Sequence, residues 1–157
     1  MPFIARYEGV IPAGKVNDES VVCGIDLAPT FCSVAGVAAP AAVNFDGLDM
    51  TRALLGQPIE RAEPIFWQYG APHAQLKPGN PDFRSPSLAV RDGRWKLLIN
   101  TDGSEARLYD LKADPGESKN LVGDKPDLAR ELWRKIRRWA QDVGHETRDG
   151  PPVAPRT

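Results

Sequence analysis

Acidic side chains crowd the stretch LYDLKADPGESKNL at residues 108–121, where they surround a Pro-Gly pair. Such a stretch is compatible with a metal loop, a catalytic acid pair or a stiff turn. An EF-hand calcium loop needs acidic or amide side chains at positions 1, 3 and 5, and Gly at position 6. Counting from Asp110 places Lys112 at position 3 and Pro115 at position 6, so this template fails. We predict no metal site here.

A structural turn explains the same stretch without a ligand. The Asp114 carboxylate is placed to accept a hydrogen bond from the backbone two residues on. Pro115 sets φ for the turn, and Gly116 is expected to take a positive φ. We therefore predict that these acids turn the chain from a strand toward the last helix, and that none is catalytic.

The sequence offers little for nucleophilic catalysis. Its two histidines are His73, in a loop, and His145, beyond the last predicted helix, and there is no Gly-x-Ser-x-Gly elbow. Cys23 and Cys32 have no metal-ligand spacing and no histidine close by, so we predict buried free thiols, with a disulfide as the alternative. We assign no catalytic residue and no metal ligand to this chain.

Basic side chains are the remaining candidates for a binding site. One group, the loop set on residues 70–86, comprises His73, Lys77 and Arg84. His73 is interpreted as an exposed, uninvolved loop residue or, alternatively, as part of a loop set that contacts an anionic ligand, because loops on rigid scaffolds often carry binding. The other group, the helix set, comprises Arg130, Arg134, Arg137 and Arg138. The helix set is interpreted as a solvated helix face or, alternatively, as a site for a sulfated or phosphorylated polyanion. Because no aromatic residues are interleaved with these arginines, the helix set predicts no nucleic-acid partner.

Composition restricts the class of protein. The 157 residues are 41% hydrophobic and 26% charged, as in soluble globular domains, and the net charge is −1. This balance gives no general attraction to nucleic acid or membrane, and no apolar run approaches the roughly 20 residues that span a bilayer. The first residues lack the basic and apolar regions of a signal peptide, so the sequence leaves the compartment open.

Hydrophobic periodicity predicts the elements that position these side chains. Strands are expected at residues 65–69, 87–91, 94–100 and 106–111. Asp92-Gly93 is expected to form a type I′ hairpin turn, and Asp124 to cap a helix near the C-terminus. The apolar stripe of this helix comprises Leu128, Leu132, Trp133, Ile136, Trp139 and Ala140. We expect the helix to cover one face of a four-stranded antiparallel meander, in a two-layer α+β unit.

The first 60 residues show a different pattern. Residues 2–7 read as a strand, and 21–23 as a short apolar run. One helix is expected from an N-cap at Asp26, and a second, at 50–55, from a cap at Asp49. The apolar face of the first helix comprises Leu27, Phe31, Val34 and Ala35. At the other end, the last residues have no periodicity and are predicted to form a disordered tail.

Four motifs follow one another along the chain: PFIARYEGVIPAGKV, GIDLAPTFCSVAGV, SPSLAVRDGRWKLLIN and LYDLKADPGESKNL. They come in the order found in type I sulfatases, so the chain resembles the C-terminal portion of that family. The family patterns are R-V-P-F-I-x-R-x-P-G-x-I, D-L-x-P-T, V-R-x-x-x-x-K-L and L-Y-D-L-x-x-D-P-x-E-x-x-N-L. The resemblance implies the C-terminal part of an α/β sulfatase fold. Residues 1–60 would be the end of the α/β domain, 61–145 the antiparallel sheet plus helix, and 146–157 a tail.

The resemblance also implies a chemistry whose central groups this sequence does not match. Family members hydrolyse sulfate esters with a formylglycine made from Cys or Ser in a Cys/Ser-x-Pro-x-Arg motif, and with a calcium ion held by Asp and Asn side chains. Cys23 precedes Gly-Ile-Asp and Cys32 precedes Ser-Val-Ala, so neither fits that motif. No catalytic residue or calcium ligand of the family is carried over, and we expect the chain alone to be inactive.

Two functions follow as expectations. In the first, the chain is the C-terminal portion of a sulfatase, in which the loop set lies near the substrate cleft and contacts the sulfate-ester substrate. In the second, it is a non-catalytic module that binds sulfated or other anionic polymers through the helix set. Without the rest of a sulfatase, residues 2–7 and 21–23 would leave strand edges and apolar surface uncovered, so we also expect self-association or a partner chain.

Overall fold

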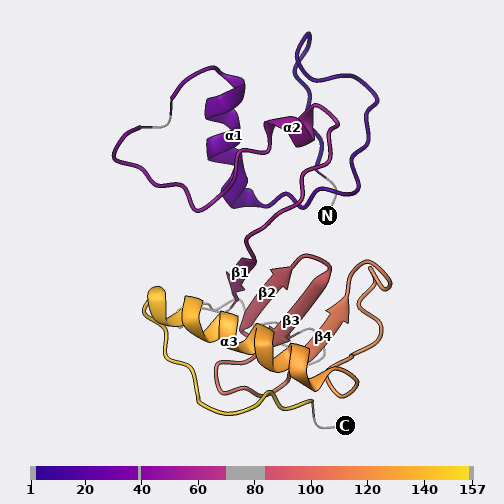
Figure 1. Ribbon diagram of the computed structural model, residues 1–157, viewed down its shortest axis with the longest axis vertical. Helices are drawn as coiled ribbons and strands as arrows, with labels where there is room; N and C mark the ends of the chain where they lie inside the picture. Colours follow the sequence, from indigo (N-terminus) through magenta and orange to yellow (C-terminus); the bar gives the residue numbers. More distant parts are fainter. Residues whose placement is uncertain (1–2, 39, 70–83, 156–157) are drawn as a thin grey trace. The chain divides into compact units, whose positions relative to one another are not determined.

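The chain forms two compact units in the computed structural model, which describes residues 3–38, 40–69 and 84–155 (Figure 1). Unit 1 is Met1–Ala62 and unit 2 is Glu63–Thr157. Within the described ranges, no helix is both long enough and apolar enough to cross a bilayer.

A four-stranded antiparallel sheet and one helix make up most of unit 2. The strands are β1 (Ile65–Gln68), β2 (Leu88–Asp92), β3 (Trp95–Ile99) and β4 (Arg107–Asp110), in the sheet order β1-β2-β3-β4. Helix α3 (Pro126–Asp142) lies across one face of the sheet (Figure 1). The predicted α+β meander with a packed C-terminal helix is confirmed.

The core of unit 2 lies between α3 and the sheet. The strands contribute Leu88, Val90, Leu97, Ile99 and Leu108, each at most 1% exposed. The helix contributes Ala129, Leu132, Trp133 and Ile136. At one margin, the rings of Phe66 and Trp139 stack with their centroids 5.2 Å apart. Alternate strand positions share one face, as do helix positions three or four residues apart, and these two faces meet.

The hairpin turn between β2 and β3 differs from its prediction. Asp92 pairs with Trp95, so the two loop residues are Gly93 and Arg94 rather than Asp92 and Gly93. Gly93 has a φ of +55°, whereas Arg94 does not have a positive φ. A glycine with positive φ at the first loop position is the pattern of a type II′ turn, and the predicted type I′ turn is wrong.

The start of α3 also differs from its prediction. The N-cap residue is Lys125, which makes no side-chain capping hydrogen bond, and not Asp124. The Asp124 carboxylate instead lies 3.1 Å from the ammonium group of Lys119. Pro126 occupies the first helical position, where its fixed φ favours the helix and its missing N–H leaves no donor to satisfy.

Unit 1 contains a 3-10 turn, η1 (Gly24–Asp26), and two helices, α1 (Leu27–Val34) and α2 (Thr51–Leu54). The two predicted helices are therefore confirmed, but the N-cap of α2 is Met50 and not the predicted Asp49. The Asp49 carboxylate nevertheless accepts a hydrogen bond from the Thr51 N–H at 2.9 Å. The strand predicted at residues 2–7 is wrong for the described residues 3–7, which are irregular. A strand needs a neighbour for its backbone groups, and the described part of unit 1 contains no strand.

The apolar face predicted for α1 is not buried. Phe31, at its centre, is 57% exposed, and Ala35 is exposed as well. The buried side chain of the helix is Thr30, which is 2% exposed. The apolar residues of α1 therefore form a face that the described residues leave partly exposed to solvent.

Residues 146–155 do not form the disordered tail that was predicted. The N–H of Val153 donates to the Gly103 carbonyl oxygen, and the Val153 carbonyl oxygen accepts from the Ala106 N–H, both at 2.8 Å. The indole N–H of Trp133 donates to the Gly150 carbonyl oxygen of the same segment at 3.0 Å. The segment is irregular, but its backbone satisfies groups of the β3–β4 turn and of α3, which periodicity cannot reveal.

Candidate functional site

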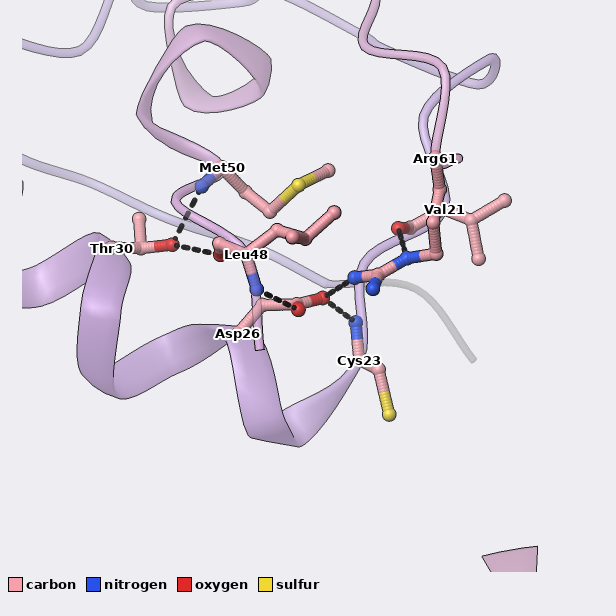
Figure 2. A network of polar contacts seen from close by, with 7 residues as sticks. All are labelled: Val21, Cys23, Asp26, Thr30, Leu48, Met50 and Arg61. Carbon is pink, nitrogen blue, oxygen red and sulfur yellow. Dashed lines mark hydrogen bonds and ion pairs between the residues drawn. The ribbon is translucent and has the colours of Figure 1, made fainter. Parts of the chain in front are cut away.

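A buried carboxylate in unit 1 connects separate stretches of chain (Figure 2). Asp26, at 0% exposure, accepts hydrogen bonds from the N–H groups of Cys23 at 2.7 Å and Leu48 at 2.9 Å. It also forms an ion pair with Arg61, whose guanidinium donates to the Val21 carbonyl oxygen. Asp26 occupies the predicted N-cap position of α1, but its side chain makes no capping bond to that helix. Besides the local bond from Cys23, which caps η1, its contacts are tertiary.

Thr30 extends this network along α1. Its hydroxyl accepts a hydrogen bond from the Met50 N–H at 2.9 Å and lies 3.5 Å from the Leu48 carbonyl oxygen. Gly47 lies so close to η1 that a Cβ there would stand 2.1 Å from the Ile25 carbonyl oxygen. The Asp and Thr of the D-L-x-P-T motif therefore hold the segment before α2 in place, and both are structural residues.

The acids of the stretch 108–121 face backbone and basic groups. The Arg94 guanidinium donates to both carboxylate oxygens of Asp110, and this contact holds the pKa of that carboxyl below its usual value. Asp114 accepts a hydrogen bond from the Lys119 N–H at 2.9 Å, which lowers the pKa of Asp114 in the same way. N–H donors stabilise the ionised form of a carboxylate, so these acids are held as anions.

The predicted structural turn is confirmed by these hydrogen bonds, with one correction. The positive φ, +56°, belongs to Glu117 and not to Gly116. At the end of the stretch, Asn120 accepts from the Leu108 N–H at 3.0 Å and donates to the Ala106 carbonyl oxygen at 3.1 Å. The amide side chain thereby covers the outer edge of β4, which would otherwise present unpaired backbone groups.

The sheet face opposite α3 gathers residues from two of the motifs. The strand register pairs Arg91 with Lys96 and Lys96 with Tyr109, so the three lie in one row across β2, β3 and β4. The Glu117 carboxylate reaches this row and lies 2.6 Å from the Lys96 ammonium group. Burial raises the pKa of the Tyr109 hydroxyl. We refer to Arg91, Lys96 and Glu117 as the charged cluster.

The loop set falls largely outside the described part of the structure. His73 and Lys77 lie outside the described residues, and Arg84 is described and exposed. The prediction that these three side chains contact one anionic ligand therefore stays a prediction.

The helix set does not form a continuous cationic face. Arg130 pairs with Asp127 at 2.8 Å, and Arg137 pairs with Asp149 of the C-terminal segment. Arg134 and Arg138 are exposed, and neither makes an ion pair with any residue that the structure describes. Two cations one helical turn apart remain available on α3.

The described residues do not fit the metal chemistry that the motifs imply. Among them, no three His, Cys, Asp or Glu side chains cluster in a way that could hold a metal ion. The two acids that are buried in the described part of the chain, Asp26 and Asp110, face guanidinium groups and N–H donors. Such surroundings repel a cation. Cys23 and Cys32 are free thiols, as predicted, but they are only partly buried.

Sequence reasoning missed three features of these networks. Arg61 lies in a segment without apolar periodicity, and no local signal announces its partner far along the chain. Asn120 was recognised as part of a motif but was given no role. The pairing of Arg91 with Lys96 follows from the hairpin register, which depends on the turn that was mispredicted.

Comparisons with known proteins agree with the four motifs. Residues 1–142 match the family described as N-sulphoglucosamine sulphohydrolase, C-terminal. A sulfatase of Formosa agariphila is 29% identical over 154 residues, which cover 88% of this chain and 26% of the relative. A delta 4,5-hexuronate-2-O-sulfatase of Bacteroides thetaiotaomicron is 31% identical over 126 residues, which cover 79% of this chain and 24% of the relative. The chain thus spans about a quarter of the length of these curated relatives.

A solved structure supports the fold. The crystal structure of Ps i-CgsB in complex with k-i-k-neocarrahexaose superposes with a TM-score of 0.64. The superposition covers 90% of this chain and 29% of that chain, at 22% sequence identity. At this identity the likeness concerns the fold alone.

Proposed function

Because the chain belongs to the family of N-sulphoglucosamine sulphohydrolase C-terminal regions, we propose that it serves a sulfatase as its C-terminal portion. In this role it contributes fold and part of the wall of the substrate cleft. The nucleophile and the calcium site come from the remainder of the enzyme, within the same polypeptide or as a separate chain. The present residues alone do not hydrolyse sulfate esters.

The exposed apolar surface of unit 1 is the observation that supports this role most directly. Nine of the thirteen large apolar side chains that the described structure leaves exposed belong to unit 1. They are Phe3, Ile4, Tyr7, Val10, Val16, Ile25, Phe31, Val37 and Val43. Apolar side chains that gather on one unit are expected where that unit packs against another part of a protein, and their concentration in unit 1 supports such packing.

The occupant that we propose for this surface is the catalytic part of a sulfatase. The relatives are about four times as long as this chain, so most of each relative lies outside the matched region. An apolar helix face at α1 and an irregular apolar segment at residues 3–7 are what a unit shows when its packing partner is removed. Burial of one such side chain contributes about 1.5–3 kcal/mol.

A chimera tests the role. The last quarter of the Bacteroides thetaiotaomicron sulfatase is replaced by this chain, and desulfation of a 2-O-sulfated delta 4,5-hexuronate saccharide is measured. We expect turnover by the chimera, and none by this chain alone or by the shortened relative. A soluble, folded chimera without turnover would contradict the proposal, as would chelator-sensitive hydrolysis of an aryl sulfate by this chain alone.

Matched substitutions test the docking surface within that chimera. Phe31→Asp places a charge on the exposed face of α1, so it should abolish turnover by preventing docking. Val143→Asp is the control, since Val143 is 50% exposed but belongs to unit 2. Equal effects of the two substitutions would argue against docking through unit 1.

A polyanion-binding module is the second candidate function. Arg134 and Arg138 of α3, which make no ion pair with a described residue, favour it. Replacing Arg134 and Arg138 with Ala should lower the salt concentration at which the chain elutes from heparin, because each phosphate- or sulfate-type contact releases counterions. Lys135→Ala is the control, since Lys135 is already paired with Asp92 at 2.6 Å. An unchanged elution point for the double variant would refute this candidate.

A further inference from the structure

The charged cluster lies on the sheet face that α3 does not cover. Residues directly opposite each other in neighbouring strands point to the same side of a sheet, and the core residues Val90 and Leu97 are opposite each other. Arg91 and Lys96 are the next opposite pair, so their side chains point to the other side. Arg91 is half-buried, and the Lys96 side chain is 25% exposed.

Two positive charges directly opposite each other destabilise a sheet. The Cβ atoms of such a pair lie about 4.5–5.5 Å apart, and like charges at that separation repel. Glu117 offsets the repulsion, since its carboxylate contacts Lys96 at 2.6 Å and attracts Arg91 electrostatically. One carboxylate therefore serves two cations.

Glu117, whose carboxylate reaches the row, has an unfavourable backbone conformation. Its φ of +56° lies in the left-handed region, which is uncommon for a residue other than Gly, Asn or Asp. The residue before it is Gly116, which would adopt this conformation more readily. An unfavourable charge pair and an unfavourable backbone thus occur at one place, and such coincidences are typical of functional sites.

The Arg91 guanidinium retains unused hydrogen-bonding capacity. It has five N–H donors, and among the described residues it makes one hydrogen bond, from Nε to the Gly93 carbonyl oxygen at 3.3 Å. No carboxylate of the described residues lies within ion-pair distance of this guanidinium. Burial lowers the pKa of Arg91, and the attraction to Glu117 acts in the opposite direction.

We propose that Arg91 and Lys96 form a binding site for a sulfate group, whose place the Glu117 carboxylate fills when no ligand is bound. A planar guanidinium beside an ammonium group suits a tetrahedral oxyanion. The guanidinium supplies paired N–H donors, and the ammonium group acts as a point charge. The choice of sulfate rests on the proposed sulfatase role. The sulfate group belongs either to inorganic sulfate, the product of hydrolysis, or to a sulfated saccharide.

The experiment measures the thermal unfolding midpoint of unit 2 by tryptophan fluorescence, with increasing sodium sulfate at constant ionic strength. Glu117→Gln removes the competing charge, and Glu117→Gly removes the charge together with the strained backbone. Each is combined with Arg91→Ala in a double variant. Glu105→Gln is the matched control: Glu105 also has a positive φ, +54°, and pairs with a cation of the sheet, Arg107, at 3.4 Å.

We expect sulfate to raise the midpoint of the two Glu117 variants more than that of the wild type, with a dissociation constant about fivefold lower. The double variants and Glu105→Gln should show only the general stabilisation that sulfate gives to any protein. Equal sulfate responses in all variants would overturn the proposal and leave Glu117 as a structural ion-pair partner. The readout does not involve hydrolysis, so its result is separate from that of the chimera.

A second arm identifies the source of the sulfate group. A sulfated heparin disaccharide and its unsulfated counterpart replace the inorganic salt at the same concentrations. A response to the sulfated disaccharide that exceeds the response to inorganic sulfate assigns the site to saccharide binding, and the reverse assigns it to the free anion. A response to the unsulfated disaccharide that equals the sulfated one would overturn recognition of sulfate.

Discussion

Replacing Asp26 with Asn probes the network that holds unit 1 together. The side chain of Asp26 is 0% exposed and that of Arg61 is 6% exposed. Asn keeps the volume of Asp but removes its charge and converts one of its two acceptor positions into an N–H donor. That donor faces either the Leu48 N–H or the donors of Cys23 and Arg61. The variant therefore has a buried cation without its partner and one contact between two donors.

The expected loss follows from the burial of both charges. Removing one partner of a buried ion pair costs about 3–5 kcal/mol, because the other charge stays desolvated. Amide hydrogen exchange suits this change, since it reports local opening residue by residue. A loss of about 3 kcal/mol corresponds to roughly 10²-fold faster exchange. We expect at least that acceleration for the amides of Leu48 and Met50.

A control and an independent probe make the result decisive. Asp46→Asn removes the same charge from an exposed residue close to Leu48 in the sequence. The chain's four tryptophans all lie in unit 2, so their fluorescence reports that unit and should stay as in the wild type. Unchanged exchange at Leu48 in Asp26→Asn, or equal acceleration in Asp46→Asn, would refute the role given to the buried pair.

Three further substitutions test separate parts of the structure. Asn120→Ala leaves backbone groups at the edge of β4 without partners, so it should lower the free energy of unfolding of unit 2 by about 2–4 kcal/mol in urea; a loss below about 0.5 kcal/mol would contradict the edge-covering role. The hydrogen bond from Arg94 is the main cause of the lowered folded-state pKa of Asp110. The pair therefore stabilises the fold at pH values above the unfolded pKa of about 3.9. This stabilisation is lost as the pH falls through the folded pKa. Arg94→Met should therefore reduce the difference in unfolding free energy between pH 6 and pH 3, and an unaltered difference would disprove this linkage. Gly47→Ala should open unit 1 without changing tryptophan fluorescence, because its Cβ would clash with the Ile25 carbonyl oxygen, and native-like exchange in unit 1 would count against that clash.

The hairpin shows how far periodicity determines a sheet. Alternation within the predicted strands places Leu88 and Val90 on one face of 87–91 and Leu97 on one face of 94–100, and all three are buried. Moving the two-residue turn along by one position shifts the pairing of the two strands by an even number of residues. Each side chain therefore stays on its face of the sheet, and only its partner across the strands changes. Alternation could therefore not separate the observed pairing of Arg91 with Lys96 from the predicted one. The faces were predictable, and the charged cluster was not.

Local patterns also could not show which polar side chains act over long distances. Asp26 has the spacing of an N-cap, and the helix after it formed as predicted. Its carboxylate is nevertheless taken up by Arg61, 35 residues away. A capping role and a tertiary role require the same residue type at the same position, so only the folded chain distinguishes them. The same limit applies to the helix set, where pairing left two of four arginines available.

The ordered structure of residues 146–155 affects the choice of a C-terminal boundary for a domain of this kind. The match to the N-sulphoglucosamine sulphohydrolase C-terminal family ends at residue 142, yet the acceptors for the Ala106 N–H and the Trp133 indole lie beyond it. These acceptors are backbone carbonyls, which almost any residue type can supply, so the hydrogen bonds place little constraint on the sequence there. A fragment ended where similarity fades would leave both donors buried and unpaired. The physical boundary of the domain lies beyond Val153, and hydrogen-bond satisfaction, rather than homology, locates it.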